Sequence, residues 1–273
     1  MDDSSIPDAS SDKDYWHRFS DFYDRVMPDA GVTNILEFGV FHGESIRWLR
    51  RKYPAARIVG FDILPTQTEW PLGDGISYLQ GDQGNPELME KLVSSCRVEF
   101  DLVIEDGSHE PPHQRDALLS TLPYLAPGAL FILEDAHTSF RELRDHRVIS
   151  GSPYTRNARG RAIFTGVFRR FRSQPRHVNL LTCLLAIEHA RALDRMLTAS
   201  EVTDICNAGF ITPSDLQALD ARIESLEFYH RVSLPIQCHG CRGSDFHFTS
   251  MTCMCGIALL DYDDSMTVAI RML

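Results

Sequence analysis

The sequence predicts an α/β fold with a doubly wound, mostly parallel sheet, and three observations lead to this prediction. Short apolar runs such as Phe100–Ile104 and Ala129–Leu133 are separated by a segment with helical spacing, His113–Leu125. This strand–helix–strand order is typical of parallel sheets. The successive runs also end in acidic residues or glycine. Strand-like segments return near the C-terminus, and we expect them to form a closing hairpin antiparallel to the rest.

Length, composition and charge limit the number of domains and the kinds of partner that this protein can have. The 273 residues are 43% hydrophobic, enough for one large domain with additions or for two small ones. A net charge of -11 argues against nucleic acid or an anionic membrane as the partner. Residues 1–14 are acidic and polar, so we expect a disordered tail rather than a signal peptide. With no apolar run long enough to span a bilayer, we expect a cytoplasmic protein.

The first half of the chain predicts a regular succession of elements. Tyr15–Val26 has aromatic residues at helical spacing, and these either pack on the sheet or cover a cofactor or substrate. After it we expect strands and one further helix, namely Asn34–Phe38, Glu44–Lys52 (the helix), Arg57–Phe61 and Ser77–Gln80.

Glycines and acids at the ends of these strands suggest a nucleotide-like ligand. Gly39 and Gly43 frame a turn where the backbone can approach a ligand, next to a helix N-terminus. Asp62 ends the second strand and suits a ribose diol, while Asp82 follows the third and can accept a hydrogen bond from an adenine amino group. Taken singly, each acid is explained as well by a loop or helix cap.

The segment from Phe100 to Phe140 predicts a metal site. Ligands of open parallel sheets bind at the carboxyl ends of the strands, so the polar residues after these two strands should converge. They are Glu105, Asp106, His109, Glu134 and Asp135. Carboxylates that close repel one another unless a cation lies among them, and Mg²⁺ prefers such oxygen ligands.

The remainder of the chain has weaker patterns. We expect a lid and helical insertion over 141–224. The segment His137–Gly160 has no clear period and is long for a plain loop, which is typical of a substrate-covering lid. Four arginines of the insertion form a solvated face, an oligomer contact or a contact with an anionic substrate: Arg169, Arg170, Arg172 and Arg176. We expect the protein to be a homo-oligomer. Further strands are predicted at Ser225–Ile236, Ile257–Leu260 and Met266–Leu273.

Four cysteines form a pattern typical of zinc sites over residues 237–256. Cys238 and Cys241 make a C-x2-C pair, and Cys253 and Cys255 make a C-x-C pair. Structural zinc is our prediction, with free thiols or a disulfide as alternatives. Such a ribbon-like insertion has three possible roles: pinning the last hairpin, shaping the acceptor pocket or binding a partner.

Several motifs together resemble class I S-adenosylmethionine-dependent methyltransferases. The resemblance is closer to the metal-dependent sugar O-methyltransferases of macrolide biosynthesis and to cephalosporin-hydroxylase-type proteins. The motifs that carry it are LEFGVFHGESIRWLRRKYPAARIVGFD (Leu36–Asp62), GDQ (Gly81–Gln83), FDLVIEDGSH (Phe100–His109), LAPGALFILEDAHTSF (Leu125–Phe140) and SLEFYHRV (Ser225–Val232). The resemblance implies a Rossmann-like methyltransferase domain with a seven-stranded sheet over residues 15–273.

The resemblance also implies roles for individual residues. Mg²⁺ would be held by Asp106, Glu134 and Asp135, with His109 as the base. S-adenosylmethionine would contact Glu37, Gly39, Gly43, Asp62, Asp82 and Gln83. Glu105 stands where the family often has a second aspartate, and Ala129 stands where it has a second glycine.

The function expected on these grounds is methyl transfer to a sugar or vicinal-diol hydroxyl of a small, glycosylated natural product, as in antibiotic biosynthesis. A hydroxyl is too weak an acid to ionise at neutral pH, and a divalent cation together with a histidine base addresses this. His113 and His137 are rivals to His109. The alternatives are a catechol or phenol O-methyltransferase and a non-catalytic binding module with the same fold.

Overall fold

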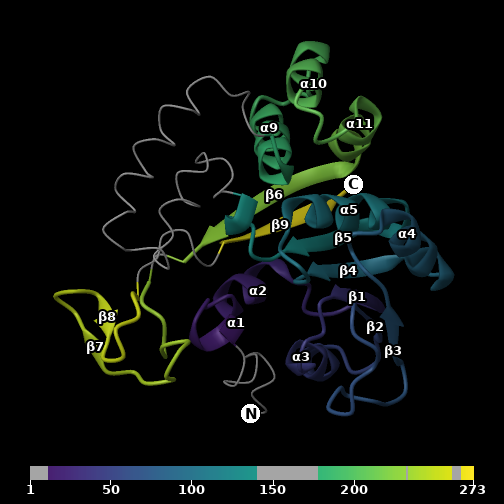
Figure 1. The fold of residues 1–273 in the computed structure, drawn as a ribbon. Coiled ribbons are helices and arrows are strands. Elements are labelled where there is room, and N and C mark those ends of the chain that lie inside the picture. The colour runs from purple at the N-terminus through teal and green to yellow at the C-terminus, as the bar shows by residue number, and fades with distance from the viewer. Residues whose placement is uncertain (1–11, 140–177, 232, 260–265) are drawn as a thin grey trace.

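A seven-stranded sheet organises the chain (Figure 1). The computed structural model describes residues 12–139, 178–231, 233–259 and 266–273. The strand order is β3-β2-β1-β4-β5-β9-β6. The strands are β1 (Asn34–Phe38), β2 (Arg57–Asp62), β3 (Ile76–Gln80), β4 (Phe100–Glu105), β5 (Leu125–Leu133), β6 (Ile223–His230) and β9 (Met266–Met272). The mostly parallel sheet predicted from the sequence is therefore confirmed.

Strand β9 is the one reversed strand of this sheet. It lies between β5 and β6 and pairs antiparallel with both, so β6 runs in the same direction as β5. The predicted closing hairpin is thus correct for β9, but β6 is not antiparallel to the parallel strands.

Helices cover both faces of the sheet (Figure 1). Alternate residues of each buried strand point to opposite faces. Leu36 of β1 belongs to the apolar core shared with α4, α5, α9 and α11, whereas Ile35 belongs to the core shared with α2 and α3. The helices are α1 (Asp12–Tyr15), α2 (Ser20–Val26), α3 (Glu44–Lys52), α4 (Pro86–Ser95), α5 (Pro111–Thr121), α9 (Leu180–Ala192), α10 (Ala199–Cys206) and α11 (Pro213–Arg222), with a 3-10 turn at Leu122–Tyr124.

The N-terminal segment differs from its prediction. The expected helix Tyr15–Val26 is divided into α1 and α2, and Arg18 between them has a φ of 56°. Helix α1 begins at Asp12, so residues 12–14 of the predicted disordered tail are helical, while residues 1–11 lie outside the described part. Lys13 and Asp14 are buried, and the Ser20 hydroxyl donates to Asp14 at 2.7 Å. Tertiary contacts thus order a segment whose composition is typical of a tail.

Other differences concern short elements. Residues 257–259 of the strand predicted at Ile257–Leu260 make only a single bridge, from Ala258 to Thr252. The cysteine-rich segment instead forms a second, two-stranded sheet of β7 (Phe246–His247) and β8 (Thr252–Cys253). Helix α4 was not predicted; Asn85 caps it by accepting a hydrogen bond from the Leu88 N–H.

Much of the predicted lid lies outside the described residues, since 140–177 are not described. Helices α9 to α11 form the described part of the predicted helical insertion. Among the described residues, no helix has the length and apolar character needed to cross a bilayer.

Gly39 marks the closest approach of β1 to the segment after β4. Its φ is +84°, and a Cβ atom there would lie 2.0 Å from the backbone oxygen of Asp106. Gly128 has a similar φ of +75°, but a Cβ atom at Gly128 would have open space around it to at least 4 Å.

We expect Gly39→Ala to destabilise the protein far more than Gly128→Ala. Both substitutions place a side chain in the left-handed region, at about 1–2 kcal/mol, but only Gly39→Ala adds a backbone clash, for about 1–3 kcal/mol more. Urea unfolding of both variants measures the difference. Equal losses of unfolding free energy would contradict this account of Gly39.

Candidate active site

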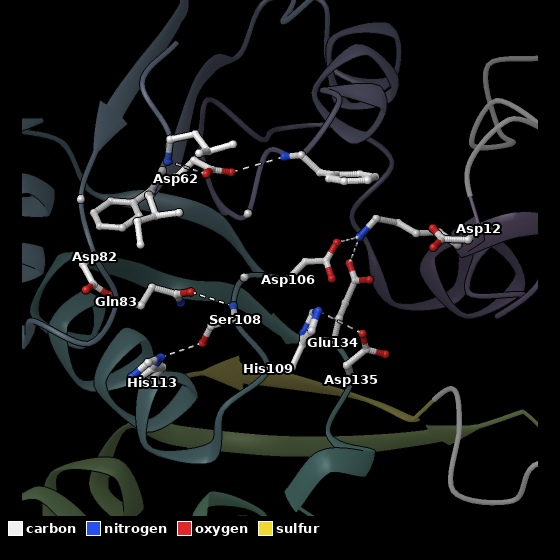
Figure 2. Close-up of a pocket in the computed structure, with 18 of the residues that line it drawn as sticks. Asp12, Asp62, Asp82, Gln83, Asp106, Ser108, His109, His113, Glu134 and Asp135 are labelled. Atoms are coloured by element: carbon white, nitrogen blue, oxygen red, sulfur yellow. Dashed lines mark hydrogen bonds and ion pairs between the residues drawn. The ribbon is translucent and has the colours of Figure 1, made fainter. Parts of the chain in front are cut away.

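A cavity of about 660 Å³ lies at the carboxyl ends of the central strands (Figure 2). Residues after β1, β2, β4 and β5 line it, together with residues of the N-terminal segment. Its size is within the range of small-molecule sites, and its position is the one expected for ligands of an open parallel sheet.

Asp106, His109 and Asp135 form a compact group in this cavity. Each offers one ligand atom, and these atoms lie within 4.8 Å of one another. His109 Nε2 is 3.4 Å from Asp135 Oδ2, and His137 Nδ1 is 3.4 Å from Asp135 Oδ1. His109 and Asp135 both have positive φ, 58° and 50°, a backbone conformation that L-residues adopt rarely and often at functional sites. Two carboxylates and an imidazole suit a divalent cation.

Glu134, the remaining predicted magnesium ligand, faces a different partner. Its side chain is 2% exposed, and Oε1 accepts hydrogen bonds from Lys13 Nζ at 2.5 Å and from the Tyr23 hydroxyl. Burial and the neighbouring Asp106 raise the pKa of Glu134 although Lys13 opposes the shift. The structure therefore places Glu134 beside the group of Asp106, His109 and Asp135 rather than within it.

Lys13 of α1 is the site residue that the sequence did not reveal. Its ammonium lies 2.5 Å from Asp106 Oδ2 as well as from Glu134 Oε1. Burial alone lowers the pKa of Lys13, but Asp106 and Glu134 outweigh it and raise the pKa well above its ordinary value. Nothing in the acidic, polar N-terminal sequence distinguishes Lys13 from a residue of a solvated tail.

The residues expected to hold a cofactor reach the cavity in part. Gly39, Asp62, Asp82 and Gln83 line it, whereas Glu37 and Gly43 do not. Asp62 Oδ2 accepts from the Val40 N–H at 2.8 Å and Oδ1 from the Leu64 N–H at 2.9 Å, so this acid also acts as a loop cap. Asp82 Oδ1 likewise accepts from the Gly84 N–H at 2.8 Å.

Gln83 and Glu105 brace the loop that carries the acidic group. Gln83 Nε2 donates to Glu105 at 2.9 Å, and Gln83 Oε1 accepts from the Ser108 N–H at 2.9 Å. Both ends of the Gln83 amide are thus engaged within the protein. Glu105 is fully buried, and burial raises its pKa to about 7. The resemblance assigns Glu105 no role in binding the metal, and the structure gives it this supporting role.

The rival bases occupy different places. His113 Nδ1 pairs with the Ser108 hydroxyl at 2.8 Å, and His113 lies near Asp82 and Gln83 in Figure 2, away from Asp135. His137 contacts Asp135, as His109 does.

A second candidate metal site lies outside the cavity. Cys238, Cys241, Cys253 and Cys255 each offer a sulfur, all within 4.8 Å of one another, and none is in a disulfide. The structure therefore brings the predicted four thiols together, and such a group is compatible with zinc.

The segment that holds most of the parallel strands is similar to a known family. Residues 36–136 match the model of a family described as a methyltransferase domain. The matched segment includes the parallel strands β2 to β5 and most of β1, and it is similar to a methyltransferase domain, as the resemblance implied.

Its relatives include sugar O-methyltransferases. The chain is 31% identical over 135 residues to mycinamicin VI 2''-O-methyltransferase of Micromonospora griseorubida, covering 46% of this chain and 33% of that protein. It is 30% identical over 141 residues to 8-demethyl-8-(2-methoxy-alpha-L-rhamnosyl)-tetracenomycin-C 3'-O-methyltransferase of Streptomyces olivaceus, covering 48% and 35%. The chain thus spans about a third of the length of these relatives.

A solved structure shares the fold over most of this chain. MycE methyltransferase from the mycinamycin biosynthetic pathway, solved with Mg, SAH and mycinamycin VI, superposes with a TM-score of 0.50. The match has 18% sequence identity and covers 93% of this chain and 49% of that one.

We expect Glu105→Gln to stabilise the protein at pH 8 but not at pH 4. The pKa of Glu105 is about 7 in the folded state and about 4.3 when unfolded, so ionisation between these values destabilises the fold. The amide keeps the hydrogen-bond acceptor but does not ionise. Urea unfolding should show a gain of about 1–3 kcal/mol at pH 8 that disappears towards pH 4.

The exposed Glu90 provides the matched control, because Glu90→Gln removes a carboxylate that is already in water. A gain for Glu105→Gln that is the same at both pH values would argue against a buried, ionisable Glu105.

Proposed function

We propose that this protein is an S-adenosylmethionine- and Mg²⁺-dependent O-methyltransferase. Its acceptor is a sugar or other vicinal-diol hydroxyl of a small, glycosylated natural product. The observation that carries the proposal is the convergence of Asp106, His109 and Asp135 at one end of the cavity, in a methyltransferase domain. The named activities of the sugar O-methyltransferase relatives support the acceptor class.

The residues present fit a divalent cation. Two carboxylates and an imidazole nitrogen lie close together, and the pairing of the Lys13 ammonium with Asp106 supports a preference for positive charge there. Asp106 and Asp135 would hold the cation, and Glu134 would join them if Lys13 moved. When bound, the cation makes a coordinated hydroxyl more acidic and S-adenosylmethionine supplies the methyl group.

The chain's own residues supply the rest of the mechanism. His109 is the base, and it accepts the hydroxyl proton at Nδ1, while Asp135 orients the ring through Nε2, 3.4 Å from Asp135 Oδ2. Asp62 and Asp82 lie in another part of the same cavity and suit the ribose and adenine of the cofactor (Figure 2). Holding the two reactants in one cavity aligns the methyl group with the acceptor oxygen.

Calorimetry and label transfer test the proposal. We expect S-adenosylhomocysteine to bind the purified protein, and Asp62→Ala to weaken that binding by about 10-fold or more. Transfer of labelled methyl from S-adenosylmethionine to a panel of macrolide glycosides and rhamnosides should require Mg²⁺ and stop with EDTA. Binding without transfer to any hydroxyl compound would favour the binding module, and transfer to catechols alone would favour a phenol acceptor.

The base assignment has its own test. We expect His109→Ala to lower kcat by about 10²–10⁴-fold while Mg²⁺ and S-adenosylhomocysteine still bind. His113→Ala and His137→Ala are the comparison variants and should lower kcat less. If His109→Ala abolishes Mg²⁺ binding instead, His109 is a metal ligand; if His137→Ala has the larger effect on kcat, His137 is the base.

A further inference from the structure

The four cysteine sulfurs have the spacing of a tetrahedral metal site. Cys238 Sγ lies 3.6 Å from Cys255 Sγ, and Cys241 Sγ lies 3.4 Å from Cys253 Sγ. A disulfide requires about 2.05 Å. Zinc–sulfur bonds of about 2.3 Å in a tetrahedron place the sulfurs about 3.8 Å apart. The distances in this chain are therefore close to those of a zinc–thiolate centre and far from those of a disulfide.

Tight turns present each cysteine pair. The Arg242 N–H donates to the Cys238 carbonyl at 2.8 Å, and the Gly256 N–H donates to the Cys253 carbonyl at 2.8 Å. Arg242 and Gly256 both have positive φ, so each turn folds back sharply after its cysteine. The first turn packs directly on the second, since a Cβ atom at Gly240 would lie 2.3 Å from Ile257 Cδ1.

The apolar core around these turns is too small to hold them alone. It consists of eight side chains, and two of the buried ones are the cysteines themselves: Tyr15, Trp16, Leu234, Cys238, Phe246, Cys253, Ile257 and Leu259. The hairpin of β7 and β8 has two residues in each strand. Such short hairpins are marginal in water, and small units of this kind usually depend on a metal or a disulfide.

Residues 234–259, which contain the four cysteines and are called the cysteine module below, are hydrogen-bonded directly to helix α1. Helix α1 lies beside this module in Figure 1. The N–H groups of Ile236 and Gln237, just before Cys238, both donate to the Tyr15 carbonyl, at 2.7 and 3.1 Å. The Arg242 guanidinium lies 3.6 Å from the centre of the Tyr15 ring. The Trp16 ring packs edge-on against His239 at 4.6 Å.

Helix α1 carries Lys13 into the active-site cavity. Lys13 is two residues from Tyr15, and its ammonium pairs with Asp106 and Glu134. Asp12, His17 and Phe19 of the same segment also line the cavity. A four-residue helix is too short to be stable without tertiary contacts. The contacts with the cysteine module supply them on the side away from the cavity.

We propose that Cys238, Cys241, Cys253 and Cys255 bind one zinc ion, and that this zinc module holds α1 across the cavity and positions Lys13 on the Asp106–Glu134 pair. Zinc is here a structural ion outside the reaction, and Lys13 is a positioning residue for the acidic group. The expected effect on S-adenosylhomocysteine binding rests on the proposed function, whereas the zinc content and the order of α1 can be tested independently of it.

Exposed cysteines give the cleanest variants. Cys241 and Cys255 are exposed, so Cys241→Ser and Cys255→Ser remove zinc ligands without cutting into the small core. Cys206, outside the cluster, provides the control Cys206→Ala. Cys241→His keeps a zinc-ligating side chain and should rescue binding, because three cysteines and one histidine also bind zinc.

Three measurements on the 273-residue chain test the proposal. Elemental analysis should find about one zinc per chain in the wild type, Cys206→Ala and Cys241→His, and much less in the two serine variants. The amides of Trp16, His17 and Phe19 donate to carbonyls of α1 and report on its order. Their hydrogen exchange should accelerate by ~10-fold or more only in the serine variants. These variants and Lys13→Met should each weaken S-adenosylhomocysteine binding by about 5-fold or more, with a combined effect smaller than the product of the two.

Two results would overturn the inference. One is a wild-type protein without zinc, whether its four thiols are free or paired. The other is loss of zinc in Cys241→Ser with unchanged exchange at α1. A chain that binds zinc and orders α1 as described but does not bind S-adenosylhomocysteine would leave this inference standing and contradict the proposed function.

Discussion

Repulsion between carboxylates at the ends of β4 and β5 is the constraint on which this site depends. The parallel sheet brings Asp106, Glu134 and Asp135 to one edge, where burial strengthens every charge interaction. Lys13 neutralises part of this negative charge by forming ion pairs with Asp106 and Glu134. Asp106 also lies close to Asp135 and His109, and the group of these three side chains suits a divalent cation.

The supporting structure serves the same edge. Gly39 allows the turn after β1 to pass within contact distance of the Asp106 backbone, and Gln83 braces the loop through Glu105 and Ser108. Glu105 is held in this apolar environment at a cost, because burial disfavours its charged form. The acidic group is therefore fixed from the sheet side by buried hydrogen bonds and from the opposite side by α1.

The N-terminal segment connects two sites that are far apart in the sequence. Tyr15 and Trp16 pack in the small core of the cysteine module, while Lys13 faces the acidic group. In the sequence the four cysteines look like an independent insertion. Their contacts with Tyr15 and Trp16 join them to the segment that carries Lys13, and these contacts lie outside the motifs that resemble sugar O-methyltransferases.

The sheet, the reversal of β9 and the edge at which Asp106, His109 and Asp135 meet could all be predicted from the sequence. Apolar periodicity and the order of strands and helices are local properties. The four-cysteine cluster could also be predicted, because thiol spacing is a local signal. The pairing of Lys13, the support given by Glu105 and the contacts of Glu134 with Lys13 and Tyr23 could not be predicted from the sequence. Lys13 contacts Asp106, 93 positions away, and Glu134, 121 positions away. Tyr23 contacts Glu134, 111 positions away. No local sequence pattern encodes contacts between residues so far apart.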